Sequence, residues 1–281
     1  MSISRLMQVA AAGNVPSGPV WTDPDLANAS YDSVSFSVAG QASLPIDFYI
    51  KPDGTRFFVA DLVSDAIYQY SLSSAWDISS ASYDSISFSV TGQGSNPRGV
   101  SFKPDGTKMF ILDAGTDDVY QYSLSTAWDI STASYDSVNL ALSALITIGS
   151  GLFFNSDGTK LFIPCRGSDY IYEYDVSTAY DIGTASYNSV RLNVVSVDNT
   201  PEGVYFSPTG DKMFFVGAGN DAVYQYSLST AFDLSSAVYD SVSFSFASQD
   251  AVPAGLSFKA DGSKMYVVGA ITDTIYQYST A

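Results

Sequence analysis

The chain has 281 residues, of which 29 are acidic, 12 are basic and none is histidine, so its formal net charge is −17. An apolar fraction of 46% is enough for a large buried core and argues against disorder. The acidity argues against nucleic acid or an anionic membrane as the main partner, because both attract clustered positive charge. The lack of histidine excludes histidine-ligated metals and every catalytic triad whose base is imidazole.

The single cysteine and the lack of long apolar runs exclude further classes of protein. Cys165 is the only cysteine, so neither an internal disulfide nor a thiolate cluster can form. No run approaches the roughly 18 apolar residues of a membrane span. We therefore expect no membrane insertion, no metal and no cofactor.

The N-terminal segment, residues 1–21, is predicted to be a separate unit made of a short helix and a stiff linker. The helix begins near Ser2, continues to Ala12 and ends at Gly13. A helix of this length is unstable alone, so we expect it to anchor the chain to another protein. The residues assigned to that contact are Ile3, Arg5, Leu6 and Met7.

The opening run Met-Ser-Ile-Ser-Arg-Leu-Met-Gln-Val-Ala-Ala-Ala-Gly resembles the N-terminus of virion structural proteins of marine tailed phages. This resemblance implies a location in the virion. It also implies that residues 1–20 bind other virion structural proteins, and that the chain could form a homo-oligomer on the particle.

From residue 22 to residue 281 the chain consists of five copies of a 52-residue unit. A Tyr-x-Tyr phrase, a turn phrase of the Pro-Asp-Gly-Thr type and an Ala-Ser-Tyr-Asp-Ser phrase recur in register, without insertions. The Tyr-x-Tyr phrase begins at Tyr68, Tyr120, Tyr172, Tyr224 and Tyr276. We read residues 22–281 as one repeat domain.

Each unit has the period-two hydrophobic pattern of strands. In the second unit we expect strands at 99–103, 108–112, 118–124 and 137–142, with a tight turn at 104–107. Four short antiparallel strands in each of five units predict an all-β, five-bladed β-propeller. The last unit lacks its fourth strand, and residues 25–38 supply a matching one. We therefore expect the N-terminal outer strand to close the ring on the C-terminal blade.

The run Pro-Arg-Gly-Val-Ser-Phe-Lys-Pro-Asp-Gly-Thr-Lys-Met-Phe-Ile at 97–111, followed by Asp-Val-Tyr-Gln-Tyr at 118–122, resembles the blade repeat of lactonase-like and surface-layer propellers. The shared residues are turn and core residues, so the resemblance implies the fold rather than an activity. We assign the other repeated residues, including the aspartates of the Asp65 and Asp77 series, to the architecture rather than to calcium.

The units differ mainly in two loops, which an antiparallel blade places on one face of the disc. We expect a polar ligand such as a sugar to bind there, since loops on a rigid scaffold commonly carry recognition; scattered surface charge is an equal alternative. The candidate ligand-binding residues are Asp47, Asp61, Arg98, Asp113, Arg166, Asp198 and Glu202.

These observations predict a protein that is not an enzyme. It would be a capsid-decoration or fibre-associated virion propeller whose variable loops serve host attachment or bind a host-surface glycan. One alternative is a secreted or surface lectin-like carbohydrate-binding propeller. A second is a lactonase-like or glycosidase-like hydrolase, in which paired carboxylates such as Asp47 and Glu202 do acid–base work.

Overall fold

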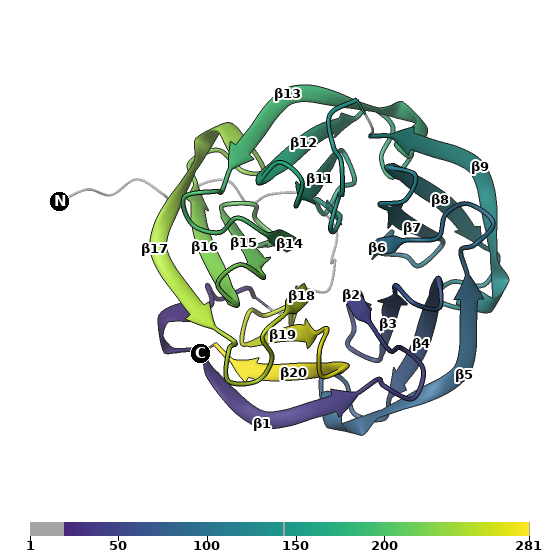
Figure 1. The fold of residues 1–281 in the computed structure, drawn as a ribbon, viewed down its shortest axis with the longest axis horizontal. Helices are drawn as coiled ribbons and strands as arrows, with labels where there is room; N and C mark the ends of the chain where they lie inside the picture. Colours follow the sequence, from purple (N-terminus) through teal and green to yellow (C-terminus); the bar gives the residue numbers. More distant parts are fainter. Residues whose placement is uncertain (1–19, 143, 281) are drawn as a thin grey trace, which may run out of the picture.

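The computed structural model describes residues 20–142 and 144–280. They form five four-stranded antiparallel sheets around one axis, which confirms the predicted all-β five-bladed propeller (Figure 1). The predicted anchor residues Ile3, Arg5, Leu6 and Met7 lie outside the described residues, and their role stays a prediction. Among the described residues, no helix is long and apolar enough to cross a membrane.

Within each blade the strands follow one another from the axis to the rim. The first blade contains β2 (Pro45–Ile50), β3 (Arg56–Asp61), β4 (Ala66–Leu72) and β5 (Ala81–Ser89). The second contains β6 (Pro97–Phe102), β7 (Lys108–Asp113), β8 (Asp118–Leu124) and β9 (Ala133–Ala141). The third contains β10 (Phe153–Phe154), β11 (Lys160–Cys165), β12 (Tyr170–Val176) and β13 (Ala185–Asn193).

The fourth blade contains β14 (Pro201–Phe206), β15 (Lys212–Gly217), β16 (Ala222–Leu228) and β17 (Ala237–Ser245). The fifth contains β18 (Pro253–Phe258), β19 (Lys264–Gly269) and β20 (Thr274–Ser279), and its outer strand is β1 (Ser30–Ser37). β1 pairs antiparallel with β20, from Ser30 opposite Ser279 to Ser37 opposite Thr274. The expected ring closure is thus present.

The outer strands begin earlier than the sequence pattern suggests. In the second blade β9 starts at Ala133, four residues before the expected start. Ser137 adopts a φ of 59°, and the register with β8 shifts at this point. The strand therefore continues through the Ala-Ser-Tyr-Asp-Ser phrase by means of a β-bulge, which interrupts the period-two pattern.

A one-turn 3₁₀ helix precedes each outer strand. These helices are η1 (Leu26–Asn28), η2 (Ile78–Ser80), η3 (Ile130–Thr132), η4 (Ile182–Thr184) and η5 (Leu234–Ser236). Each begins after an aspartate whose carboxylate accepts a bond from a helix N–H; Asp129, for example, accepts from Ser131 at 3.0 Å. The Asp77 series therefore consists of N-caps.

The residue before the capping aspartate covers the tight turn of its blade. Trp128 has a φ of 65°, and its ring lies directly over Gly106, whose φ is 75°. Trp76, Tyr180 and Phe232 cover the equivalent glycines in the same way. The turn glycine is therefore needed twice, for its left-handed backbone and for the space beneath the aromatic ring.

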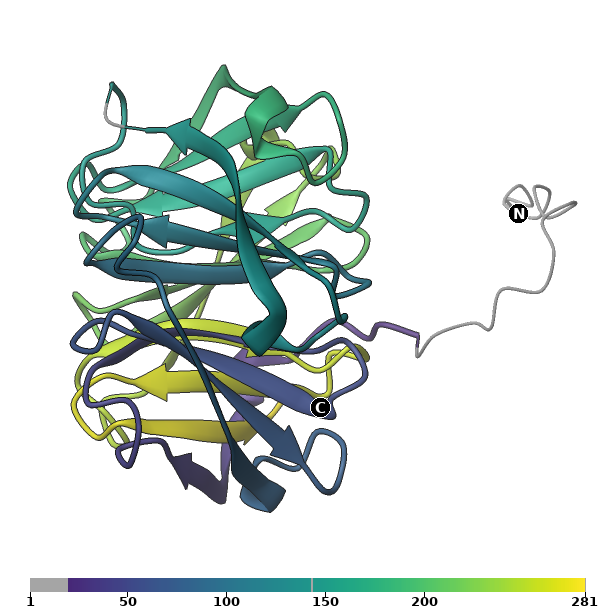
Figure 2. The ribbon, with the colours of Figure 1, turned by 90° about the vertical axis from the view of Figure 1, so that its right-hand side faces the viewer.

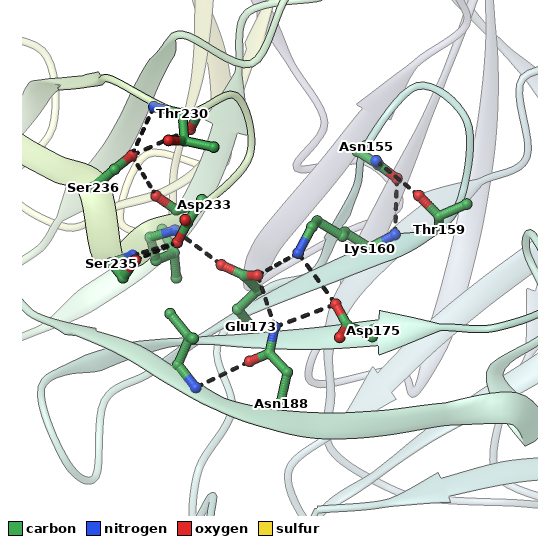
Figure 3. A network of polar contacts seen from close by, with 12 residues as sticks. Asn155, Thr159, Lys160, Glu173, Asp175, Asn188, Thr230, Asp233, Ser235 and Ser236 are labelled. Atoms are coloured by element: carbon green, nitrogen blue, oxygen red, sulfur yellow. Dashed lines mark hydrogen bonds and ion pairs between the residues drawn. The ribbon is translucent and has the colours of Figure 1, made fainter.

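The blades are joined by a repeated polar contact as well as by apolar packing. The Gln69 side chain accepts a bond from the Ile130 N–H of the next blade at 3.2 Å and donates to Asp84 of its own blade at 2.8 Å. In the third blade the two functional groups are exchanged: Glu173 accepts from the Leu234 N–H at 2.9 Å, and Asn188 donates to Glu173 at 2.7 Å (Figure 3). Lys160 completes this junction by pairing with Glu173. One carboxylate and one amide are thus present at the junction in either arrangement.

We predict that Gly106→Ala lowers the free energy of unfolding by about 2–4 kcal/mol, because the added Cβ meets the Trp128 ring in a backbone region that disfavours alanine. Gly40→Ala is the matched control, since a Cβ there meets nothing within 4 Å; it should change stability by less than about 0.5 kcal/mol. Urea unfolding measures both. Equal effects of the two substitutions would contradict the packing role of Trp128.

We also predict that the exchanged pair in the third blade is energetically coupled. Glu173→Gln removes the carboxylate from Lys160 and should cost about 1–3 kcal/mol. Adding Asn188→Asp recreates the arrangement of the other blades and should recover most of that loss. A double-mutant cycle by thermal unfolding measures the coupling, and additivity within about 0.5 kcal/mol would contradict it.

Candidate functional site

The two ends of the strands define two faces of the disc, which Figure 2 shows edge-on. The loop face carries the connections from each outer strand to the next inner strand and the loops between the second and third strands of each blade. The turn face carries the Pro-Asp-Gly turns. The strand order confirms that both variable loops emerge on one face.

The inner strands surround an axial cavity of about 230 Å³. Close to the loop face, each blade places one residue of a single repeat position at the axis, in its inner strand or just before it: Asp47, Gly99, Gly151, Gly203 and Gly255. A Cβ on Gly151 would lie 2.8 Å from the Glu202 carbonyl oxygen, and one on Gly203 would lie 3.1 Å from the Ala254 carbonyl oxygen. The four glycines therefore allow the strands to meet in a narrow ring, which we call the neck.

Asp47 is the one side chain in the neck and is 7% exposed. Its Oδ2 accepts a bond from the Val100 N–H of the next blade at 2.8 Å. Burial raises the pKa of Asp47 to about 8; the N–H bonds from Val100 and Phe48 oppose this shift, and the charge of Glu202 adds to it. At neutral pH this carboxyl group is mainly protonated.

Glu202 lies on the loop-face side of the neck and is 4% exposed. Its Oε1 pairs with the Arg166 Nε at 3.1 Å. Burial raises the pKa of Glu202 to about 7, while Arg166 and Arg98 lower it and Asp198 raises it. The carboxyl group therefore exchanges its proton near physiological pH.

Arg98 completes this cluster, which we call the mouth: Asp47, Arg98, Arg166 and Glu202. Burial lowers the pKa of Arg98, the charge of Arg166 lowers it further, and the charge of Glu202 opposes both. The Arg98 Nε is buried and has no hydrogen-bond partner among the described residues. The mouth thus offers two carboxyl groups that titrate near neutrality and a guanidinium with a free donor.

The structure places three other predicted site residues beneath the loops rather than at the mouth. Asp61 accepts bonds from the Leu44 and Ser64 N–H groups at 2.7 and 2.8 Å. Asp113 and Asp198 likewise accept backbone N–H bonds from the loops around them, and all three are at most 1% exposed. Their oxygens brace the loops, so we leave these three residues out of the proposed site.

The carboxylate that braces the loops of a blade can come from either of two repeat positions. In the second blade Asp113 lies where a Cβ on Gly94 would be, whereas in the fourth blade Asp198 lies where a Cβ on Gly217 would be. The fifth blade follows the fourth, with Asp250 against Gly269. The third blade has Ile146 and Cys165 at the two positions, which accounts for the buried cysteine as a core residue.

Sequence reasoning missed the layer of side chains below the neck. One repeat position on the inner strands reads Tyr49, Ser101, Phe153, Tyr205 and Ser257, and all five residues line the axial cavity. The detectable signal was variability at a single inner-strand position.

Within the described part of the chain, no group of three or more cysteine, aspartate or glutamate side chains is arranged to hold a metal ion. The mouth itself combines two carboxyl groups with two guanidinium groups. This arrangement suits acid–base chemistry and the binding of a polar group.

Comparison with protein families found a match between residues 46–185 and the model described as "Lactonase, 7-bladed beta-propeller". The match covers just under half of the chain and includes Asp47, Arg98 and Arg166. A comparison with curated proteins found no match. The lactonase part of the predicted resemblance is therefore supported, although this chain has five blades.

Solved structures show the same kind of fold. A protein from Lactobacillus plantarum is 16% identical with a TM-score of 0.53, covering 84% of this chain and 67% of that one. A putative 6-phosphogluconolactonase from Bacteroides uniformis is 13% identical with a TM-score of 0.51, covering 84% and 72%. A functionally unknown protein from Desulfotomaculum acetoxidans is 13% identical with a TM-score of 0.49, covering 80% of this chain, which spans 62% of its length.

The expectation that the chain is not an enzyme is contradicted by the lactonase match. That expectation rested on the absence of histidine and on the structural character of the repeated residues. It gave too little weight to buried carboxyl groups, whose pKa values depend on tertiary burial and so leave no mark in a local motif.

We predict that Asp47 makes stability fall as pH rises between about 4 and 8. The ordinary pKa is 3.8 and the native one is about 8, so over this range the native state holds a proton that the unfolded chain releases. Asp47→Asn cannot ionise and can still accept the Val100 N–H bond. At pH 8.5 it should therefore be more stable than the wild type, by on the order of 1–2 kcal/mol.

Thermal unfolding from pH 5 to pH 8.5 checks this prediction. Asp105→Asn is the control, because hydrogen bonds from Lys103 and Thr107 outweigh the effect of burial and hold the pKa of Asp105 at about 2. Asp105→Asn should therefore lower stability by a constant amount from pH 5 to pH 8.5, and its difference from the wild type should shrink only below about pH 4. A parallel pH dependence of Asp47→Asn and the wild type would contradict the buried, protonated state of Asp47.

Proposed function

We propose that the mouth hydrolyses a lactone or a related small ester. The observation that carries this proposal is the buried Glu202 carboxylate, which is paired with Arg166 and has a native pKa near 7. Its charge also reaches Asp47 and raises the pKa of that group. A carboxylate with that pKa is a competent general base at neutral pH. The lactonase family match supports the same reaction class independently.

In this reaction Glu202 removes a proton from a water molecule, and the water oxygen attacks the carbonyl carbon of the ester. The carbonyl oxygen becomes an oxyanion, which the positive charge of the Arg98 guanidinium stabilises. The bond between the carbonyl carbon and the ring oxygen then breaks. Asp47, protonated at neutral pH, gives its proton to the departing oxygen. The products are a carboxyl group and a hydroxyl group, which in a lactone belong to one hydroxy acid. Glu202 is then protonated and Asp47 ionised, and proton exchange with water restores both groups for the next cycle.

Arg166 acts through Glu202 rather than on the substrate. Its Nε bonds Oε1 of Glu202 at 3.1 Å, which leaves the second carboxylate oxygen for the water. Its positive charge also keeps the pKa of Glu202 from rising further with burial. We therefore treat Arg166 as a positioning residue.

The proposal is tested by screening five- and six-membered lactones for acid release in the presence of a pH indicator. The rate with a turned-over lactone should rise with pH through a pKa near 7, because Glu202 must lose its proton to act as the base. It should fall again above about pH 8, because Asp47 must hold its proton to act as the acid. Glu202→Gln should lower kcat/KM at least about 100-fold. Arg98→Met should lower kcat by about 100-fold or more.

Asp105→Asn, an isosteric change on the turn face, is the matched control and should leave kcat/KM within about twofold. Circular dichroism establishes that each variant is folded. If no lactone is turned over, or if folded Glu202→Gln retains full activity, the proposed hydrolysis is wrong.

The predicted virion role remains a separate proposal. It depends on residues 1–20, nearly all of which lie outside the described residues. Deleting residues 1–20 should leave a folded propeller that no longer incorporates into particles. Glycan binding through Arg98 and Glu202 is likewise a proposal, and a glycan array of the wild type against Arg98→Met addresses it.

A further inference from the structure

Below the neck, on the side of the turn face, the axial cavity is a compartment different in character from the mouth. Its volume of about 230 Å³ exceeds the roughly 150 Å³ of an engineered protein cavity that takes up benzene. The lining extends from Asp47 and Gly203 at the neck to Pro52, Pro104 and Pro208 at the turns. The compartment therefore runs through most of the thickness of the disc.

The walls of this compartment are largely aromatic. Tyr49, Phe153 and Tyr205 come from the layer below the neck, and Phe258 lies beside Tyr205 with ring centroids 5.1 Å apart. Phe153 meets the other side of Tyr205 edge-on at 5.3 Å. These contacts hold the rings in place before any ligand arrives, which lowers the entropic cost of binding.

The compartment also carries unused hydroxyl groups. Tyr49 and Tyr205 lie deep in the protein, and burial raises the pKa of both phenols above the usual value. Both rings nevertheless remain partly accessible, because they face the cavity. Within the described residues no hydrogen bond engages either phenol oxygen. Ser101 and Ser257 add two more hydroxyl groups to the same layer.

The charge of the lining selects against anions. Asp47 is the one acidic side chain among the residues that line the cavity, and no lysine or arginine is among them. A carboxylate, phosphate or sulfonate in this compartment would lose its hydration without gaining a cationic partner. An uncharged ring compound loses little hydration and gains contact with the aromatic walls.

We propose that this compartment is a second ligand site, which binds an uncharged aromatic ring compound carrying one hydrogen-bonding group, such as a phenol or an aryl alcohol. The ring lies among Tyr49, Phe153, Tyr205 and Phe258, and its polar group bonds to the tyrosine and serine hydroxyls. The lining of this site includes Asp47 but not Arg98, Arg166 or Glu202. The site therefore adjoins the proposed hydrolytic mouth at Asp47 and is otherwise built from different residues.

The test compares two ligands that share one ring system, 2-naphthol and naphthalene-2-sulfonate, by isothermal titration calorimetry at pH 7. We expect 2-naphthol to bind with one-to-one stoichiometry and a Kd below about 1 mM. The sulfonate should bind at least tenfold more weakly. Methyl glucoside, which is neutral but not aromatic, should show no binding in the same range.

Ser257→Phe fills the compartment and should weaken 2-naphthol binding at least tenfold. Ser87→Phe introduces the same side chain at an exposed rim position of β5 and should have no effect. Tyr205→Phe keeps the ring but removes its hydroxyl, and should weaken binding about two- to fivefold. If Ser257→Phe fails to fold, Ser101→Leu provides the same blockade from the opposite wall.

Three results would overturn the proposal: no binding of 2-naphthol by the wild type, equal binding of the sulfonate or the glucoside, or unchanged binding in the folded blocking variants. Glu202→Gln should bind 2-naphthol like the wild type. A failure of lactone hydrolysis therefore leaves this test intact, and the converse also holds.

Discussion

Closure of the ring is the constraint on which the rest of this structure depends. β1 and β20 are far apart in the sequence, yet their pairing completes the fifth blade and leaves no blade with an unpaired third strand. A closed ring of five similar 52-residue units must bring five inner strands to one axis. The neck, the cavity and the mouth all follow from that convergence, because residues at one repeat position are forced to meet.

The junctions between blades show how the repeat tolerates change. Gln69 and Asp84 in one blade become Glu173 and Asn188 in another, so the charge moves across the contact without changing the number of donors and acceptors. Beneath the loops, the second blade uses Asp113, the last residue of β7. The fourth blade uses Asp198 instead, which lies in the loop before β14. In both places the buried polar groups need a hydrogen-bond partner at one point in space. A side chain at either of two sequence positions can supply that partner.

The acidity of the chain is therefore mainly architectural. Many aspartates cap 3₁₀ helices, brace loops or complete blade junctions. The carboxyl groups suited to chemistry are Asp47 and Glu202, whose pKa values burial raises to about 8 and about 7. The acidic side chains thus form two groups, which differ in their burial and in the residues that surround them.

The repeat pattern alone was enough to predict the number of blades, the residues of the tight turns and the closure of the ring. A strict repeat of period-two strands fixes how many blades there are, and the strand missing from the last unit matches the one at the N-terminal end. It also indicated that Asp47, Arg98, Arg166 and Glu202 share one face. Only the tertiary structure decided that Asp47 and Glu202 are buried at the axis, that Asp61, Asp113 and Asp198 brace loops, and that Tyr49 and Tyr205 line a cavity. Burial and pKa depend on neighbours from other blades, and no local pattern encodes those neighbours.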